Sequence, residues 1–168
     1  HSVEYVINLL KNFRMKYGIN FVSFLDYAMM KNSEWFIDFC NQMKKNELTT
    51  LVYWGMNADV RTADGPLMAQ ARDSGCRYIF FRDNYSTHKE MDFNKPRIVA
   101  AVKAATQESI HPLMTFSVGY PDTTWKDVVE DLKFLIDNQI HVNPQFYQPY
   151  PPSPAFDQLN FSLQDKEK

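Results

Sequence analysis

The sequence predicts an α/β fold of parallel strands, with about five strands and five helices. Stretches with apolar residues at helical spacing alternate with short apolar runs, which is typical of βαβ units joined by right-handed crossovers. The strand-like runs lack a polar face, as expected for a parallel sheet covered by helices. These patterns allow an open doubly wound sheet or an arc of a barrel, and periodicity alone does not decide between them.

The first half of the chain contains three expected helices, bounded by capping and stop signals. Ser2 and Asp64 can each accept a hydrogen bond from a first-turn amide and so begin a helix. Gly18 can end the helix that begins after Ser2, and Gly75 can end the helix that begins after Asp64. The expected elements are a helix over 3–17, a strand over 20–25, a helix over 34–43, a strand over 50–54, a helix over 65–74 and a strand over 77–81.

The second half continues the alternation. Its expected elements are a polar stretch over 83–94, a helix over 95–106, a strand over 112–118, a helix over 125–136 and a strand over 144–148. Thr124 and Asp127 form a capping-box pattern before the second of these helices. Prolines between 149 and 154 exclude regular structure, since they lack N–H groups. We expect one domain over 1–158 and a frayed charged tail over 159–168.

Composition excludes several classes of function. The apolar fraction of 45% indicates a folded globular chain, and the net charge of -2 gives no reason to expect nucleic acid or an anionic membrane as a partner. The apolar runs are too short to span a bilayer, and no leader pattern opens the chain, so we expect a cytoplasmic location. Cys40 and Cys76 make no disulfide framework and are expected to be buried thiols in a reducing compartment.

Polar residues just beyond the strand ends are the expected place for a functional site. In parallel α/β folds, ligands bind at the carboxyl ends of the strands. The residues at these positions are Asp26, Asn57, Asp59, Arg61, Arg82, Asp83, Asn84, Gly119, Tyr120, Gln148 and Tyr150. The four histidines show no ligand spacing, and His88 falls in the polar stretch, so no zinc site is expected.

Taken in order, these strand ends resemble those of the radical S-adenosylmethionine enzymes, especially the branch with an N-terminal cobalamin-binding domain. The resemblance covers residues 1–158 and favours a partial TIM-type (β/α) barrel over the open sheet. It is carried by Phe24 to Tyr27, Ser74 to Arg77, Thr115 to Pro121, Gln145 to Tyr147 and Pro149 to Pro151.

The resemblance implies S-adenosylmethionine and a 4Fe–4S cluster as cofactors, with cobalamin in a domain that this chain lacks. In the family, three cysteines spaced CxxxCxxC after the first strand hold the cluster, because thiolates are soft anionic ligands. Cys40 and Cys76 cannot replace them, so the first strand and the cluster loop are expected to be missing from this chain. The cofactor-binding residues that the resemblance implies are Asp26, Asn57, Asn84, Gly119 and Tyr120.

The chain also departs from the family pattern. Arg82 and Asn84 stand where the family often has a glycine and a glutamate, Asp59 and Arg61 reverse a common Arg and Asp order, and Asp122 replaces a glycine. We therefore expect the catalytic-core fragment of a radical enzyme that is inactive alone. The alternative is a degenerate barrel that serves as a binding or scaffolding module. An unrelated lyase or aldolase is less supported, because no lysine ends a strand.

Structural interpretations stand beside the functional ones. Asp26 can cap a turn, Asp59 and Arg61 can form a partly solvated ion pair, and Gly119 can serve only the turn before Pro121. The implied partners are a small-molecule substrate in the parent enzyme and a polypeptide at the exposed sheet edge over 20–25, either the missing N-terminal segment or another chain.

Overall fold

The computed structural model describes residues 1–82, 88–120, 122–148 and 156, and in this part five parallel strands form one sheet in the order β1-β2-β3-β4-β5. The elements are α1 (Val3–Tyr17), β1 (Phe21–Phe24), the 3-10 helix η1 (Met29–Lys31), α2 (Ser33–Lys45), β2 (Tyr53–Ala58), α3 (Gly65–Asp73), β3 (Cys76–Phe81), α4 (His88–Gln107), β4 (His111–Val118), α5 (Trp125–Asp137) and β5 (Val142–Phe146).

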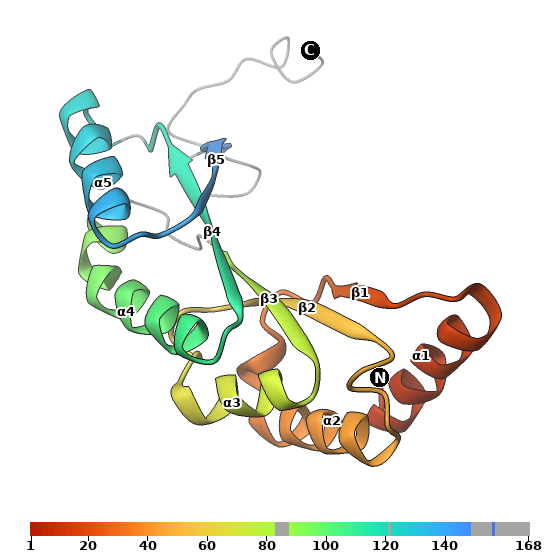
Figure 1. Cartoon of the computed structure of the whole chain (residues 1–168). Helices are drawn as coiled ribbons and strands as arrows, with labels where there is room; N and C mark the ends of the chain where they lie inside the picture. Colours follow the sequence, from red (N-terminus) through yellow and green to blue (C-terminus); the bar gives the residue numbers. More distant parts are fainter. Residues whose placement is uncertain (83–87, 121, 149–155, 157–168) are drawn as a thin grey trace, which may run out of the picture.

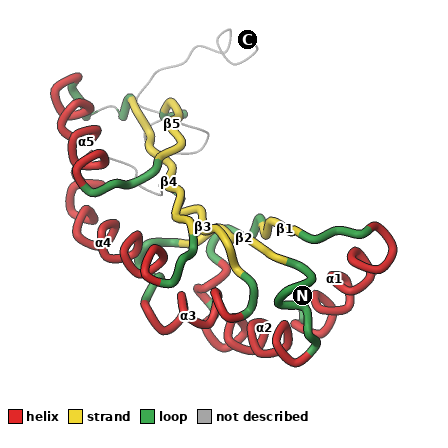
Figure 2. The backbone as a smooth tube through the Cα atoms, in the orientation of Figure 1, coloured by secondary structure: helices red, strands yellow, loops and turns green. Residues whose placement is uncertain are grey.

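The described strands form an arc of a barrel. Figures 1 and 2 show the five α-helices along the outside of a curved row of strands. Doubly wound sheets reverse their strand order and carry helices on both faces, whereas this sheet keeps the sequence order throughout. The prediction of a partial (β/α) barrel is confirmed. The predicted tail over 159–168 lies outside the described residues.

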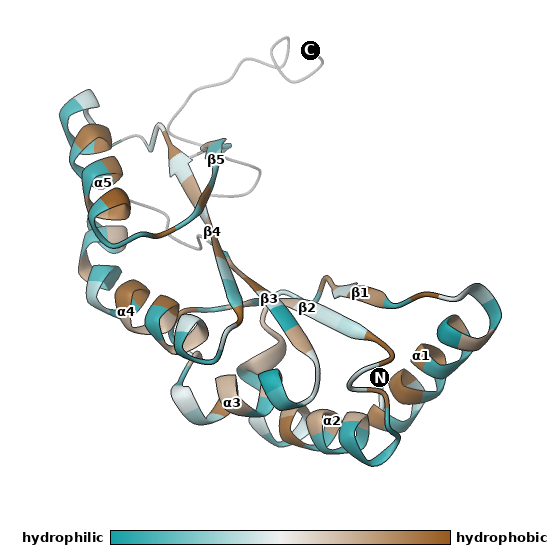
Figure 3. Ribbon diagram, viewed as in Figure 1, coloured by the Kyte–Doolittle hydropathy of each residue, from teal (hydrophilic) through white to brown (hydrophobic). Residues whose placement is uncertain are grey.

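The hydrophobic core lies between the sheet and the helices, and Trp54 is at its centre. Its ring meets Phe24, Phe36 and Phe39 in edge-on contacts with centroids 5.2 to 6.2 Å apart. The Trp54 indole N–H, fully buried, donates a hydrogen bond of 3.0 Å to the Ser74 carbonyl at the end of α3. Each helix carries both apolar and polar residues along its length (Figure 3), as amphipathic packing on one sheet face requires.

Alternation along β2 places a second set of side chains on the inner, helix-free face of the described sheet. Gly55 faces this side because its neighbours Trp54 and Met56 are buried in the core. A Cβ atom at Gly55 would lie 2.2 Å from the Tyr78 ring, so only glycine fits there. The Tyr78 hydroxyl bonds Ser23 Oγ at 2.5 Å, and its ring stacks on Phe21 at 5.8 Å. Tyr78 therefore fills this part of the inner face.

The carboxyl edge of the sheet is staggered. Phe81, the last residue of β3, pairs with Met114, and β4 continues for four more residues to Val118 beside β5. At roughly 3.3 Å per residue, this places the ends of β4 and β5 about 13 Å beyond the end of β3.

Several predicted strand boundaries were wrong. Strand β2 begins at Tyr53 rather than Thr50, because the amides of Leu51 and Val52 bond the Leu48 carbonyl in a turn. Asn57 therefore lies inside the strand and not beyond it. Strand β5 begins two residues before Pro144.

Helix α4 differs most from the prediction. It begins at His88 rather than at Lys95 and contains Pro96 in its interior. The extra turns are held because Met91 is fully buried and because His88 contacts α5. Among the described residues, no helix is long and apolar enough to cross a membrane.

Trp54→Phe tests the central packing. We expect the free energy of unfolding to fall by about 2 kcal/mol or more, since the change leaves a cavity and an unpaired Ser74 carbonyl. Chemical denaturation measures it. Trp125→Phe is the matched control, because Trp125 is 75% exposed and its loss should leave stability nearly unchanged. Equal effects of the two substitutions would contradict the role assigned to Trp54.

Candidate functional site

A cavity of about 590 Å³ lies at the carboxyl end of β1, and Asp26 is on its rim. Phe24, Tyr27 and Trp35 supply aromatic walls, and Lys31 brings a charge opposite to that of Asp26. The Asn32 side chain fixes the start of α2 by accepting a hydrogen bond of 3.1 Å from the Trp35 amide. The opening thus combines an apolar wall with one acidic and one basic group.

Asn57 is the most unusual polar residue of the sheet. It is only 6% exposed, and its side-chain nitrogen has no hydrogen-bond partner in the described part of the chain. Alternation with Met56 and Ala58, which are buried in the core, places Asn57 on the inner face. An unsatisfied buried amide costs about 1–3 kcal/mol, so the Asn57 nitrogen is a donor that a ligand or a water molecule can satisfy.

Asp59 and Arg61 form the ion pair that the sequence allowed. Asp59 accepts bonds from the Arg61 amide at 2.8 Å and from its guanidinium Nε at 2.9 Å. The hydrogen bond from Arg61 lowers the pKa of the Asp59 carboxyl, and it outweighs the effect of burial. Arg61 is 58% exposed at its side chain, so the pair contributes little to stability and mainly orders the loop after β2.

Gly119 and Tyr120 follow β4 and differ in their surroundings. Gly119 has a φ of +94°, which favours glycine, and open space where a Cβ would lie. Tyr120 is 3% exposed, its ring lies 4.7 Å from that of Tyr147, and its carbonyl accepts a 3.0 Å bond from the Thr123 amide. Gly119 is therefore open to approach, whereas Tyr120 is packed.

The structure brings the predicted residues to one edge but at different depths. Asp26 and Gly119 are exposed, whereas Asn57 and Tyr120 are buried. Arg82 and Gln148 are exposed beyond their strands. The predicted residues Asp83, Asn84 and Tyr150, together with the proline-rich exit over 149–155, lie outside the described residues.

The two cysteines do not fit an iron–sulfur cluster. Cys40 lies on α2 and Cys76 at the amino end of β3, and both are buried free thiols, as predicted. Burial is the main cause that raises the pKa of Cys40 to about 11 and that of Cys76 to about 12. Cluster ligands are thiolates, so these residues are neither placed nor ionised for that task.

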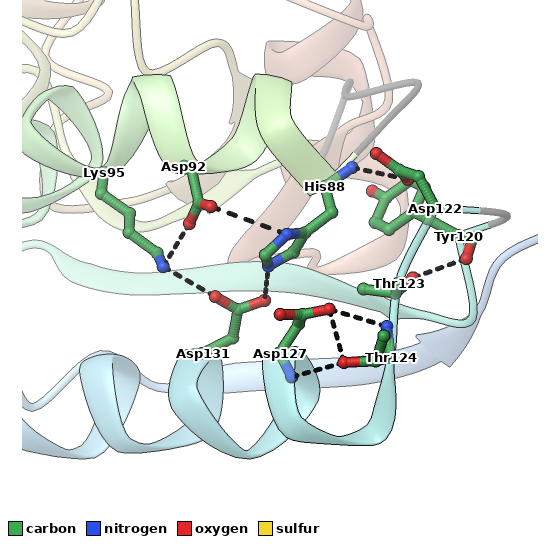
Figure 4. A network of polar contacts seen from close by, with 9 residues as sticks. All are labelled: His88, Asp92, Lys95, Tyr120, Asp122, Thr123, Thr124, Asp127 and Asp131. Atoms are coloured by element: carbon green, nitrogen blue, oxygen red, sulfur yellow. Dashed lines mark hydrogen bonds and ion pairs between the residues drawn. The ribbon is translucent and has the colours of Figure 1, made fainter.

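A polar cluster between α4 and α5 was missed by the sequence reasoning (Figure 4). We call His88, Asp92, Lys95 and Asp131 the α4–α5 cluster. Asp131 Oδ2 lies 2.8 Å from His88 Nε2, and its Oδ1 lies 2.7 Å from Lys95 Nζ. Lys95 also contacts Asp92 at 2.5 Å.

The α4–α5 cluster had a partial signal in the sequence. Positions 88, 92 and 95 share a helix face, so extending the helix to His88 would have joined three members. Asp131 comes from another helix, and no local pattern links it to them. Three members of the cluster, His88, Asp92 and Asp131, have oxygen or nitrogen atoms within 4.8 Å of one another, as the ligands of a metal ion would. The Lys95 ammonium, however, already lies between the two carboxylates.

Comparisons with known proteins agree with this fold. No protein-family model matches the chain. It is 28% identical over 139 residues to an uncharacterized methyltransferase of Pyrococcus horikoshii, covering 80% of this chain and 30% of that protein. It is 26% identical over 162 residues to the anaerobic magnesium-protoporphyrin IX monomethyl ester cyclase of Cereibacter sphaeroides, covering 92% of this chain and 26% of the cyclase.

Two solved structures share the arrangement of strands and helices. The radical S-adenosylmethionine methyltransferase TsrM from Kitasatospora setae, solved with cobalamin and a 4Fe–4S cluster bound, matches with a TM-score of 0.80 at 10% identity, over 92% of this chain and 33% of TsrM. Methylornithine synthase (PylB) matches with a TM-score of 0.62 at 14% identity, over 90% of this chain and 45% of the synthase.

The chain thus spans less than a third of each curated relative. The sequence similarities and the shared fold support the predicted resemblance to the radical S-adenosylmethionine superfamily.

Proposed function

We propose that this chain is the S-adenosylmethionine-binding part of a radical enzyme's catalytic core, and that it is inactive alone. The observation that carries the proposal is the buried side-chain nitrogen of Asn57, on the inner face near the carboxyl edge, which has no hydrogen-bond partner among the described residues. In the parent enzyme, a reduced cluster would cleave the cofactor to start radical chemistry on a small-molecule substrate. That cluster, and cobalamin if the parent uses it, would be held outside this chain, whose thiols do not fit it.

The described residues supply complementary groups for such a ligand. The Asn57 amide would donate to a carboxylate, a ring nitrogen or a ribose oxygen, and Asp26 would accept from an amino or hydroxyl group. Gly119 would let a flat base approach the backbone because no side chain stands in the way. By the family resemblance, Asn84 would add a further polar contact.

Asn57→Leu tests cofactor binding, measured by calorimetric titration with S-adenosylmethionine. We expect the affinity to fall tenfold or more, since a hydrogen bond to a charged ligand is worth about 1.5–3 kcal/mol. We also expect unchanged or higher thermal stability without ligand, because the substitution removes an unsatisfied buried group.

The matched control is Asn8→Leu, because Asn8 is exposed on α1. It should not change the affinity. Failure of the unaltered chain to bind the cofactor would contradict the proposal. A loss of stability in Asn57→Leu would instead make Asn57 a structural residue.

Catalysis by the isolated chain is a separate test. Incubation of the chain with S-adenosylmethionine, iron, sulfide and a strong reductant should give no 5′-deoxyadenosine above a protein-free blank. The reason is that both cysteines are buried and hold their protons far above neutral pH. Product detected by chromatography would show that this chain assembles a working cluster.

The second candidate function is a non-catalytic binding or scaffolding module. The absence of suitable thiolates among the two cysteines favours it, since a scaffold needs none. A chain that binds no cofactor and is unaffected by Asn57→Leu would favour this alternative over the first.

We also propose that the free edge of β1 pairs with a parallel strand of another polypeptide segment. Among the described strands, β1 pairs with β2 alone, and Phe21 in β1 and Leu25 just after it are 43% and 82% exposed. Unpaired edges with apolar residues recruit further strands.

Sedimentation velocity tests this edge. We expect the chain to self-associate as its concentration rises, and Leu25→Lys to weaken the association, because a lysine on an edge opposes strand addition. Phe93→Lys is the control, since Phe93 is 75% exposed on α4, a helix that connects β3 and β4 and is therefore not next to β1 in the sheet order. A single monomeric species at all concentrations would contradict the proposed pairing.

A further inference from the structure

We infer that the α4–α5 cluster is a positioning device, which holds the described residues of the loop between β4 and α5 (119, 120 and 122–124) in a fixed position relative to the start of α4. The inference rests on the proposed function, since that loop carries part of the candidate cofactor site. His88, Asp92, Lys95 and Asp131 would act on a ligand only through the loop and touch no reacting atom.

His88 connects the start of α4 both to the loop after β4 and to α5 (Figure 4). Its backbone N–H donates to Asp122 Oδ1 at 3.2 Å, and its ring Nε2 lies 2.8 Å from Asp131 Oδ2. Its Nδ1 lies 3.6 Å from Asp92 within α4. One residue at the start of α4 is therefore held both by the loop after β4 and by the helix that follows that loop.

The burial of Asp131 argues that the cluster does more than hold two helices together. Its side chain is 3% exposed and lies on the α5 face that also buries Val128 and Leu135. An apolar residue there would pack without a desolvation penalty, whereas a buried carboxylate requires partners in fixed positions. The carboxylate thus makes the helix contact depend on the placement of His88 and Lys95.

Lys95 places a positive charge between the carboxylates of Asp92 and Asp131. Burial lowers the pKa of Lys95, but hydrogen bonds with Asp131 and Asp92 outweigh it and raise the pKa above its ordinary value. The ammonium stays charged near neutral pH and bridges the two helices, with its Nζ also 5.3 Å from the Phe134 ring centre. Directional contacts of this kind fix the relative position of α4 and α5 more narrowly than apolar packing does.

The effect reaches the candidate site through a short path. Asp122, held by His88, is followed by Thr123, whose amide and hydroxyl both donate to the Tyr120 carbonyl. Thr124 then caps α5 in a reciprocal pair with Asp127. Movement of Asp122 would therefore be passed to Tyr120 and to Gly119 beside it.

The test compares the chain with the double variant Lys95→Met, Asp131→Leu, which removes the buried pair and keeps apolar volume. We expect the free energy of unfolding to be retained while the amides of Thr123 and Thr124 exchange with solvent about tenfold faster, the effect of losing one charge-assisted bond. Affinity for S-adenosylmethionine should fall severalfold. The matched control is the double variant Lys126→Met, Glu130→Leu, which removes an exposed ion pair of 3.8 Å on α5. It should change neither the exchange of these amides nor the affinity for S-adenosylmethionine.

A second pair of variants keeps the test decisive if the first misfolds. His88→Ala should speed exchange of the same amides, and His88→Gln should restore protection, because the glutamine amide can reach Asp131 in place of Nε2. Unchanged exchange in the double variant and in His88→Ala overturns the inference, as does faster exchange with unchanged affinity. Faster exchange in a chain that never bound S-adenosylmethionine supports the positioning of the loop and refutes the proposed function instead.

Discussion

The packing of Trp54 against α2 and α3 is the constraint on which the rest of the structure depends. The ring is enclosed by three phenylalanines, and its N–H is tied to the end of α3, so β2 has one permitted orientation. Because side chains alternate along a strand, fixing Trp54 on the helix side sends Gly55 and Asn57 to the inner face. The close approach of Tyr78 and the unpaired amide both follow from that one choice.

Local signals accounted for most of the fold. Ser2, Asp64 and Thr124 cap the helices that they were expected to cap, since each satisfies first-turn amides within a few residues. The start of α4 was missed because it depends on burial of Met91 and on contacts with α5, which come from distant parts of the chain. The prediction began this helix at Lys95, whereas the structure has Pro96 inside α4.

The candidate site was predictable by position and not by environment. The strand-end rule selected Asp26, Asn57 and Gly119, but nothing local shows that Asn57 is buried without a partner or that Tyr120 is packed on Tyr147. Asn57 and Asp131 are both buried polar groups, yet they are opposites in chemistry. The side-chain nitrogen of Asn57 has no hydrogen-bond partner among the described residues, whereas the Asp131 carboxylate lies 2.8 Å from His88 Nε2 and 2.7 Å from Lys95 Nζ. Asn57 can therefore accept a further partner, whereas the contacts of Asp131 tie α5 to α4.

The staggered carboxyl edge sets the shape of whatever the chain holds. Asp26 and Asn57 lie at the level where β1 and β2 end, while Gly119 lies past the longer β4. Between these levels, the strand ends step by about 13 Å from β3 to β4, and Tyr78 packs on the inner face against Gly55. A compact ligand would meet one level alone. Contact with both Asn57 and Gly119 would therefore require an extended molecule, because the two residues lie at different levels of the edge.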